Sequence, residues 1–319
     1  MLSQEQIDEY HKNGVLVIEN VLTEEEVNTA RQQLHQQLLT FGIDHDKVLS
    51  GEQILNENGR IKGSPSKIFY GKWKIDVQLH EKIYGYMKSL MEETYFKNNA
   101  LFNHPYEKAD DILPYIDRIC WRLPDHIRPE GGLSMHLDRN PFDPYMQKSD
   151  GLKKWKPIQA FISLTDQFGS TSGGLRVVKG FHTRIDQYFS KSEPEYSTGE
   201  FYRMNQQIHA LLQKELEPIN APKGSLVCWD NRLPHATTEY FDGFDSREVI
   251  YIGWLPNVNI NKKYWLEQSY AIKKNIPPPA YCDSEKRKHH HNDKNNKENA
   301  DRDWTLNDLT PKQKLMLGL

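Results

Sequence analysis

A histidine and an aspartate separated by one residue, His136 and Asp138, form the sharpest chemical feature of the sequence. In an extended segment, residues i and i+2 point to the same side, so the imidazole and the carboxylate converge on one point. Gly131-Gly132 precedes the pair and Asn140-Pro141 follows it, which indicates a junction between a strand and a loop, where functional sites tend to lie. A purely structural contact at a strand end is the alternative, because short motifs of this kind also occur by chance.

A third metal ligand would have to come from a distant part of the chain. Of the 13 histidines, most lie on expected helices, before the strand-rich region or in a charged tract. The remaining candidates are His126, His182 and His235. His235 is favoured because it follows a short expected strand and a turn, whereas His126 lies in a proline-rich loop and His182 could line the mouth of a site. Two histidines and one carboxylate with open coordination positions are the ligand set of non-haem iron(II) oxygenases.

Arg247 lies twelve residues beyond His235 and begins an alternating strand that runs to Trp254. An arginine beside a metal site is well placed to bind a carboxylate with two parallel hydrogen bonds. An arginine at the start of a strand can equally point into water. The sequence therefore indicates an anion-binding residue and leaves the solvated alternative open.

The elements that must position these residues fall into a helix-rich flank and a strand-rich core. Over residues 1–111, Ser3 and Thr23 begin two capping boxes, a buried strand is expected at 15–18, and helix is expected from about Asp76 to Lys97. Over residues 112–256, short strands alternate with glycine and proline turns, which is typical of a sandwich or barrel. The clearest strand, Ile158–Thr165, alternates between two faces.

Three further segments complete the organisation. Residues 184–218 form an insertion with helical spacing in its second half, which we interpret as a lid or a wall. Residues 285–303 contain one apolar residue, Ala300, and are therefore expected to be a flexible surface loop. Leucines return over 306–319, which predicts a terminal helix. The basic run Lys153-Lys154-Trp155-Lys156 is interpreted as a solvated turn.

Composition narrows the class of protein. The chain has 319 residues and a formal net charge of −3, which does not favour nucleic acid as a partner. No apolar run approaches the length of a membrane span, so no membrane partner is expected. Three cysteines lie far apart, without a CxxC pair, which fits a reducing compartment. We therefore expect a cytoplasmic protein; its oligomeric state is not indicated.

A series of motifs spanning nearly the whole chain, in order, carries a family resemblance. They are QIDEYHKNGVLVIENVLTEEEV, GGLSMHLDRNP, WKPIQAFISLTD, SGGLRVVKGFH, KGSLVCWDNRLPHAT and SREVIYIGW. The sequence resembles the phytanoyl-CoA dioxygenase family of iron(II)- and 2-oxoglutarate-dependent oxygenases.

The resemblance implies an α+β, mainly β fold in which one domain, residues 1–319, forms a double-stranded β-helix (a cupin-like jelly roll) with N-terminal and insertion helices. It implies that His136, Asp138 and His235 bind Fe(II), that O2 reacts there, and that Arg247 binds the distal carboxylate of 2-oxoglutarate. It further implies that Thr237 contacts this cosubstrate. On the same basis, Arg122, Gln159 and Ser163 are expected to face the site, the first two as cosubstrate contacts.

The implied reaction is hydroxylation of a C–H bond in a small-molecule or lipid-like substrate, with release of succinate and CO2. The carboxylate of Asp138 favours this outcome, because halogenating relatives have a small residue there. A protein or nucleic-acid oxygenase is an alternative within the enzymes. A catalytically silent binding module, or a scaffold in which His136 and Asp138 form a structural pair, is an alternative outside them.

Overall fold

A computed structural model describes residues 1–55, 68–96, 104, 106–142, 153–190, 202–279 and 301–319. It contains two five-stranded antiparallel sheets flanked by helices, which confirms the predicted mixture of helix and strand. The main sheet has the order β1 (Val15–Ile18), β8 (Leu226–Asp230), β4 (Ile158–Ser163), β10 (Arg247–Pro256) and β2 (Ile112–Arg122). The minor sheet has the order β6 (Tyr202–Arg203), β3 (His136–Leu137), β9 (His235–Thr237), β5 (Leu175–Val177) and β7 (Glu217–Pro218).

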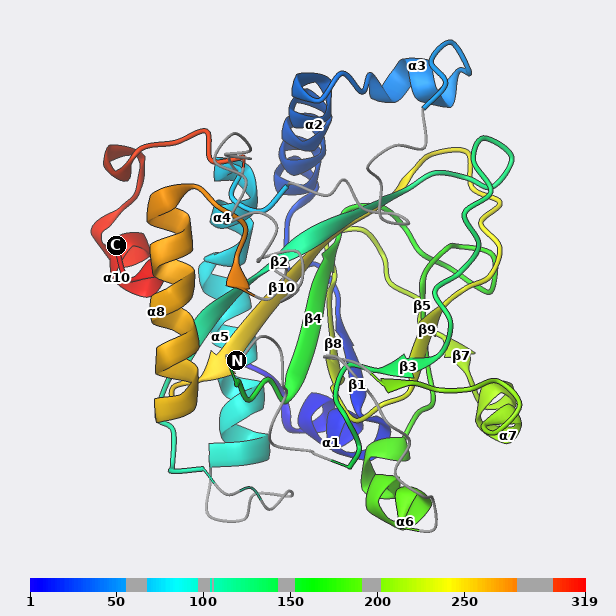
Figure 1. The fold of residues 1–319 in the computed structure, drawn as a ribbon, viewed down its shortest axis with the longest axis vertical. Helices are drawn as coiled ribbons and strands as arrows, with labels where there is room; N and C mark the ends of the chain where they lie inside the picture. Colours follow the sequence, from blue (N-terminus) through cyan, green and yellow to red (C-terminus); the bar gives the residue numbers. More distant parts are fainter. Residues whose placement is uncertain (56–67, 97–103, 105, 143–152, 191–201, 280–300) are drawn as a thin grey trace, which may run out of the picture.

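The elements lie in layers, with helices against one side of the main sheet and the minor sheet on its other side (Figure 1). The helical elements are α1 (Gln4–Asn13), α2 (Glu24–Thr40), α3 (His45–Leu49), α4 (Lys72–Gln78), α5 (Glu81–Met91), η1 (Glu92–Phe96), η2 (Phe181–Thr183), α6 (Ile185–Phe189), α7 (Ala210–Lys214), α8 (Asn259–Lys274), η4 (Leu306–Asp308) and α10 (Pro311–Leu317). In Figure 1, α2, α4, α5, α8 and α10 lie on the helical side, and α6 and α7 lie beside the minor sheet.

Successive side chains of β4 pack into two different hydrophobic cores, one on each face of the main sheet. Ile158, Ala160 and Ile162 pack in the core beneath the helices, whereas Phe161 packs in the core between the sheets. Because successive strand residues point to opposite faces, Gln159 and Ser163 share the inner face with Phe161. All six residues of the strand are buried, since both faces of the main sheet are covered.

The N-terminal flank follows its sequence signals closely. Both capping boxes are confirmed, with Ser3 paired to Gln6 and Thr23 paired to Glu26. The helical stretch predicted from about Asp76 to Lys97 is interrupted between α4 and α5, because the chain leaves helical geometry at His80, whose side chain caps α5 by accepting the Lys82 amide at 3.2 Å. Helix α5 continues directly into η1, and Lys97 lies outside the described residues.

Two features of the core differ from expectation. The prediction of a solvated turn at 153–156 is wrong, since Lys154 and Lys156 are only 2% and 8% exposed. Both lysine ammonium groups make cation–π contacts with aromatic rings. Lys156 Nζ lies 4.4 Å from the centre of the Tyr115 ring, and Lys154 Nζ lies 5.2 Å from that of Tyr264. The eleven-residue strand β2 was not anticipated, because a proline and two charged residues interrupt its apolar pattern.

The C-terminal segment returns to the helical side of the main sheet. The carboxylate of Asp301 accepts hydrogen bonds from the amides of Phe69 and Tyr70, both at 2.7 Å, and from that of Gly71 at 3.0 Å. Residues 285–300 of the expected flexible loop lie outside the described residues, whereas its last three residues are anchored, Asp301 by these contacts, Arg302 by Asn275 and Asp303 by the Lys72 amide. The predicted terminal helix is confirmed as α10. No helix in the described ranges is both long and apolar enough to cross a bilayer.

Candidate active site

Strand register brings two of the predicted ligands together. His136 of β3 and His235 of β9 are directly paired residues of neighbouring antiparallel strands, and their ring centres lie 4.2 Å apart. The Nδ1 atom of His136 lies 2.8 Å from the carbonyl oxygen of Ser134, and that of His235 lies 3.0 Å from that of Leu233. A carbonyl oxygen only accepts, so both Nδ1 atoms carry the proton. Each Nε2 atom therefore presents a lone pair.

Both lone pairs face the carboxylate of Asp138. His136 Nε2 lies 3.5 Å from Asp138 Oδ1, and His235 Nε2 lies 3.4 Å from Asp138 Oδ2. The Gln159 amide Nε2 donates a hydrogen bond to Asp138 Oδ2, which holds the carboxylate from the inner face of β4. Two imidazole nitrogens and one carboxylate are thus oriented toward one point, with an outer contact that fixes the acid, as in protein metal sites.

The electrostatics of His136 and Asp138 favour metal binding over proton binding. Burial and the neighbouring His235 lower the pKa of His136 to about 4, so its Nε2 is unprotonated at neutral pH. Burial alone would raise the pKa of Asp138, but the neighbouring His235, His136 and Lys156 side chains outweigh burial and hold this pKa well below its usual value. The site therefore combines a carboxylate anion at Asp138 with a neutral imidazole at His136 at neutral pH.

Arg247 is the first residue of β10, lies on the inner face of the main sheet and is only 2% exposed. Its Nε donates to Gln167 Oε1 at 2.7 Å, and its Nη1 donates to Cys120 Sγ at 3.2 Å. Within the described part of the chain, no carboxylate lies within ion-pair distance of this guanidinium. Because an unpaired buried charge is costly, Arg247 is suited to an anion that enters the site.

The other predicted contacts differ in their surroundings. Thr237 Oγ1 accepts the Leu133 amide at 2.7 Å, which leaves its hydroxyl hydrogen to donate elsewhere. Arg122 is paired in register with Arg247, yet its guanidinium binds the carbonyl oxygens of Thr238 and Glu239 and the carboxylate of Asp125. These contacts hold the connection that follows β9, and a role for Arg122 in cosubstrate binding stays a prediction. Ser163 donates to the Thr165 carbonyl.

The rival histidines lie elsewhere. His182 Nε2 contacts the carbonyl of His11 in α1 at 3.0 Å, and His126 lines a separate surface pocket with residues of α3. The sequence reasoning did not identify Gln167 and Cys120 as the contacts of Arg247. Their positions depend on tertiary packing between a loop and β2, for which no local pattern exists.

Solved structures confirm the fold as a known arrangement. GlcNAc Inducible Gene 2 (GIG2, DUF1479) of Candida albicans superposes with a TM-score of 0.74 over 99% of this chain and 76% of that chain, at 18% identity. The epimerase SnoN, solved in complex with Fe3+, alpha ketoglutarate and nogalamycin RO, gives a TM-score of 0.51 over 79% of this chain and 83% of that chain, at 10% identity. At such identities the likeness concerns the fold alone.

Sequence comparison places the chain in a family. The family model Phytanoyl-CoA dioxygenase (PhyH) matches residues 10–240, and a second model, Gig2-like, matches residues 174–316. A Dictyostelium discoideum protein named "Putative phytanoyl-CoA dioxygenase" is 24% identical over 302 residues, which cover 83% of this chain and 78% of that protein. The chain belongs to the phytanoyl-CoA dioxygenase family, as its motifs predicted.

Proposed function

We propose that this protein is an Fe(II)- and 2-oxoglutarate-dependent dioxygenase that hydroxylates a C–H bond of a small-molecule or lipid-like substrate. The observation that carries the proposal is the convergence of His136 Nε2, His235 Nε2 and the Asp138 carboxylate, with both imidazole tautomers fixed by backbone carbonyls. Two nitrogens and one carboxylate leave open coordination positions on iron(II), which cosubstrate and oxygen require.

The buried cation supports the choice of cosubstrate. Arg247 has no carboxylate partner in the described part of the chain, and its fork of donors matches a carboxylate. In this proposal Arg247 binds the distal carboxylate of 2-oxoglutarate, and the hydroxyl of Thr237 donates a further hydrogen bond. SnoN, which shares the fold, was solved with Fe3+ and alpha ketoglutarate.

The residues of the chain have distinct tasks in this reaction. Iron, when bound, would supply the oxidising chemistry, with 2-oxoglutarate consumed to succinate and CO2. His136, His235 and Asp138 would hold the metal, and the hydrogen bond from Gln159 to Asp138 would keep that carboxylate from rotating. Asp138 would also serve as an oxygen ligand of the metal, which favours hydroxylation over halogenation.

Further aspects of the proposal concern the chain as a whole. We propose that the two sheets form a double-stranded β-helix and that residues 1–319 act as one domain. The same proposal includes a cytoplasmic protein with a small-molecule partner rather than nucleic acid, which the net charge of −3 supports.

The test is an anaerobic titration of metal-free protein with Fe(II) and then 2-oxoglutarate, followed by visible absorption. We expect a charge-transfer band that requires both ligands and is lost in Asp138→Ala and His235→Ala. His126→Ala is the matched control and should keep the band, since His126 lies in another pocket. A folded wild-type protein without a band would contradict the dioxygenase function and favour a binding module.

A further inference from the structure

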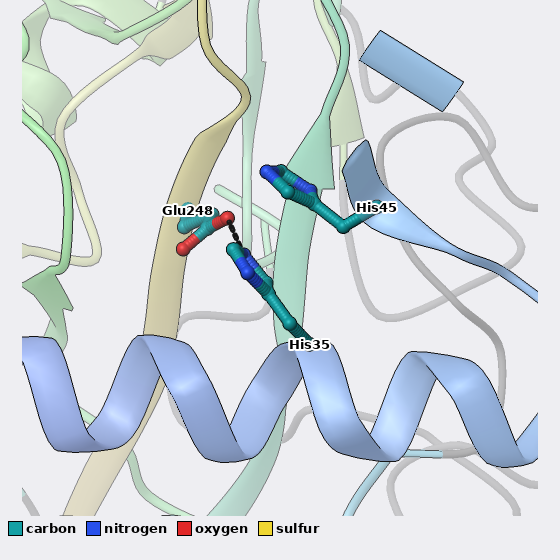
Figure 2. Close-up of side chains that lie close together, drawn as sticks. All are labelled: His35, His45 and Glu248. Carbon is teal, nitrogen blue, oxygen red and sulfur yellow. Dashed lines mark hydrogen bonds and ion pairs between the residues drawn. The ribbon is translucent and has the colours of Figure 1, made fainter. Parts of the chain in front are cut away.

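A second cluster of potential metal ligands lies on the helical side of the main sheet. Side-chain ligand atoms of His35 in α2, His45 in α3 and Glu248 in β10 all lie within 4.8 Å of one another (Figure 2). Glu248 is completely buried, at 0% exposure. A buried carboxylate requires hydrogen-bond or ion-pair partners. The hydrogen bonds of the three residues therefore indicate whether the cluster could bind a metal.

Those hydrogen bonds leave no lone pair of His45 for a metal. Trp121 Nε1 donates to His45 Nδ1 at 3.2 Å, and an indole can only donate, so this Nδ1 is unprotonated. The proton of neutral His45 is then on Nε2, which faces Asp245 Oδ1 at 3.4 Å. The rings of His35 and His45 are also stacked, 3.6 Å apart and 18° from parallel, so their in-plane lone pairs do not converge.

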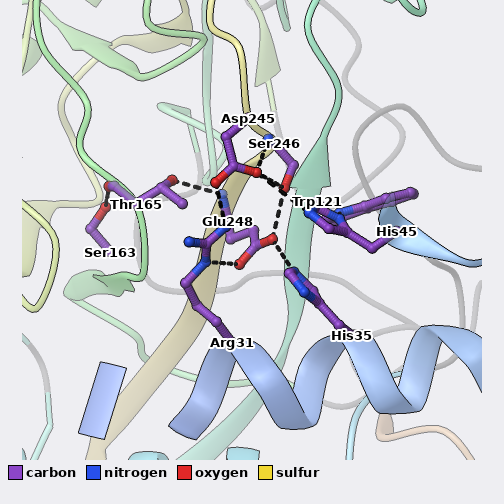
Figure 3. Close-up of polar contacts among 9 residues, drawn as sticks. All are labelled: Arg31, His35, His45, Trp121, Ser163, Thr165, Asp245, Ser246 and Glu248. Atoms are coloured by element: carbon purple, nitrogen blue, oxygen red, sulfur yellow. Dashed lines mark hydrogen bonds and ion pairs between the residues drawn. The ribbon is translucent and has the colours of Figure 1, made fainter. Parts of the chain in front are cut away.

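The cluster instead binds Glu248 tightly from several elements (Figure 3). Arg31 Nε of α2 donates to Glu248 Oε2 at 2.8 Å, and His35 Nε2, one turn later on the same helix, lies 2.6 Å from Oε1. Ser246 Oγ donates to Oε1 at 2.7 Å. The backbone is fixed as well, because the Glu248 amide donates to Thr165 Oγ1 at 3.0 Å and its carbonyl accepts the Leu164 amide at 2.9 Å.

Glu248 directly follows Arg247, and consecutive strand residues point to opposite faces. The carboxylate is therefore held on the outer, helical face, while the guanidinium of Arg247 lies on the inner face. On that inner face, the hydrogen bonds of Arg247 go to an amide oxygen, a thiol and the hydroxyl of Tyr251, which are uncharged partners. The charged contacts that fix this part of β10 are those of Glu248, the next residue in the strand.

We propose that Glu248, held by Arg31 and His35, is a positioning residue that places Arg247 to receive the distal carboxylate of the cosubstrate. The inference rests on the proposed function. It assigns α2 a role in cosubstrate binding although this helix lies on the far side of the main sheet from the predicted metal ligands. Loss of the contacts of Arg31 and His35 with Glu248 would shift the guanidinium of Arg247 relative to the metal site. A misplacement of about 1 Å at an active site can lower the reaction rate up to about a hundredfold.

The test compares two 2-oxo acids of equal chain length in the anaerobic iron titration. 2-Oxoglutarate has the distal carboxylate, whereas 2-oxopentanoate lacks it and can only chelate the metal. In Glu248→Gln we expect about tenfold weaker 2-oxoglutarate binding, with unchanged affinity for 2-oxopentanoate and for iron. Arg31→Gln, whose parent side chain is 25% exposed, is the second variant if Glu248→Gln does not fold, and it should show the same selective loss.

Asp301→Asn is the matched control, because Asp301 is another carboxylate held by several donors but lies far from Arg247 in sequence and anchors the C-terminal segment. It should lower stability and leave the ratio of the two affinities unchanged. Equal weakening of both acids in Glu248→Gln, or no weakening of either, would overturn the positioning role while the wild-type band upholds the dioxygenase. Absence of the band with both acids in the wild type would overturn both.

Discussion

Arg247→Met separates the cost of burying a charge from its use in binding. Methionine keeps a long apolar chain and removes both the charge and the fork of donors. In the absence of ligand, Gln167 Oε1 loses its donor, which costs about 1–3 kcal/mol. Removing a buried cation that has no carboxylate partner in the described residues returns a comparable amount. The melting temperature of the ligand-free variant should therefore stay close to that of the wild type.

Binding of 2-oxoglutarate should stabilise the wild type more than Arg247→Met. Loss of one partner of a buried charge pair costs about 2–5 kcal/mol, which is a roughly 30- to 4,000-fold loss of affinity for 2-oxoglutarate. At a concentration one hundred times its Kd, the ligand stabilises the wild type by about 2.7 kcal/mol. With an unfolding entropy of about 0.7 kcal/mol/K for 319 residues, this raises Tm by about 4 °C. At the same concentration the variant should gain about 1 °C or less.

The assay is thermal unfolding of the anaerobic iron-loaded protein with and without 2-oxoglutarate. Arg176→Met in β5 is the matched control, because Arg176 contacts the Leu216 carbonyl at 3.2 Å and should not affect the ligand-induced shift. If Arg247→Met keeps the full 2-oxoglutarate shift of the wild type, the buried guanidinium is not the carboxylate partner, and the reasoning from its missing counter-charge is refuted.

Two further predictions concern Lys74 and Gly132. Burial lowers the pKa of Lys74 from 10.5 to about 8, so between these pH values the folded state binds fewer protons than the unfolded state and stability rises with pH. Lys74→Met should therefore be more stable than the wild type at pH 7, by up to about 3 kcal/mol. Urea unfolding should show this difference in the free energy of unfolding decrease between pH 8 and 10.5. A pH-independent difference would contradict the reasoning. A Cβ on Gly132 would lie 2.7 Å from the Thr238 carbonyl oxygen and 2.8 Å from that of Thr237, so Gly132→Ala should displace β9 and weaken iron binding in the anaerobic titration, by about tenfold. Gly85→Ala, which meets nothing within 4 Å, is the control, and equal iron affinities in the two variants would show that β9 tolerates the methyl group.

The sequence was informative wherever one local pattern determines one structure. The capping boxes at Ser3 and Thr23 and the two faces of β4 follow from short-range rules that tertiary packing did not overrule. The convergence of His136 and Asp138 follows in the same way from their spacing. The pairing of His136 with His235 was anticipated by elimination, and strand register now explains it.

The contacts that the sequence did not reveal depend on segments far apart in the chain. Lys154 and Lys156 resemble a solvated charge run, and their burial depends on the rings of Tyr115 and Tyr264 and, for Lys156, on the Asp117 carboxylate at 4.0 Å. Glu248 resembles an ordinary charged residue at a strand start, because its partners Arg31 and His35 lie more than two hundred residues earlier. Such long-range polar contacts have no periodicity from which they could be recognised.

The order of strands in the main sheet has a consequence for biosynthesis. Among the strands of the described ranges, β1, at residues 15–18, pairs only with β8, at residues 226–230, and β2 pairs only with β10. At translation rates of about 5–20 residues per second, β1 waits roughly 10–40 s for its partner. Its apolar residues and those of β2 and β4 are therefore exposed on the nascent chain until β8 and β10 have been synthesised. We expect the nascent protein to depend on chaperones during this interval, and to fold late and cooperatively rather than progressively from its N-terminus.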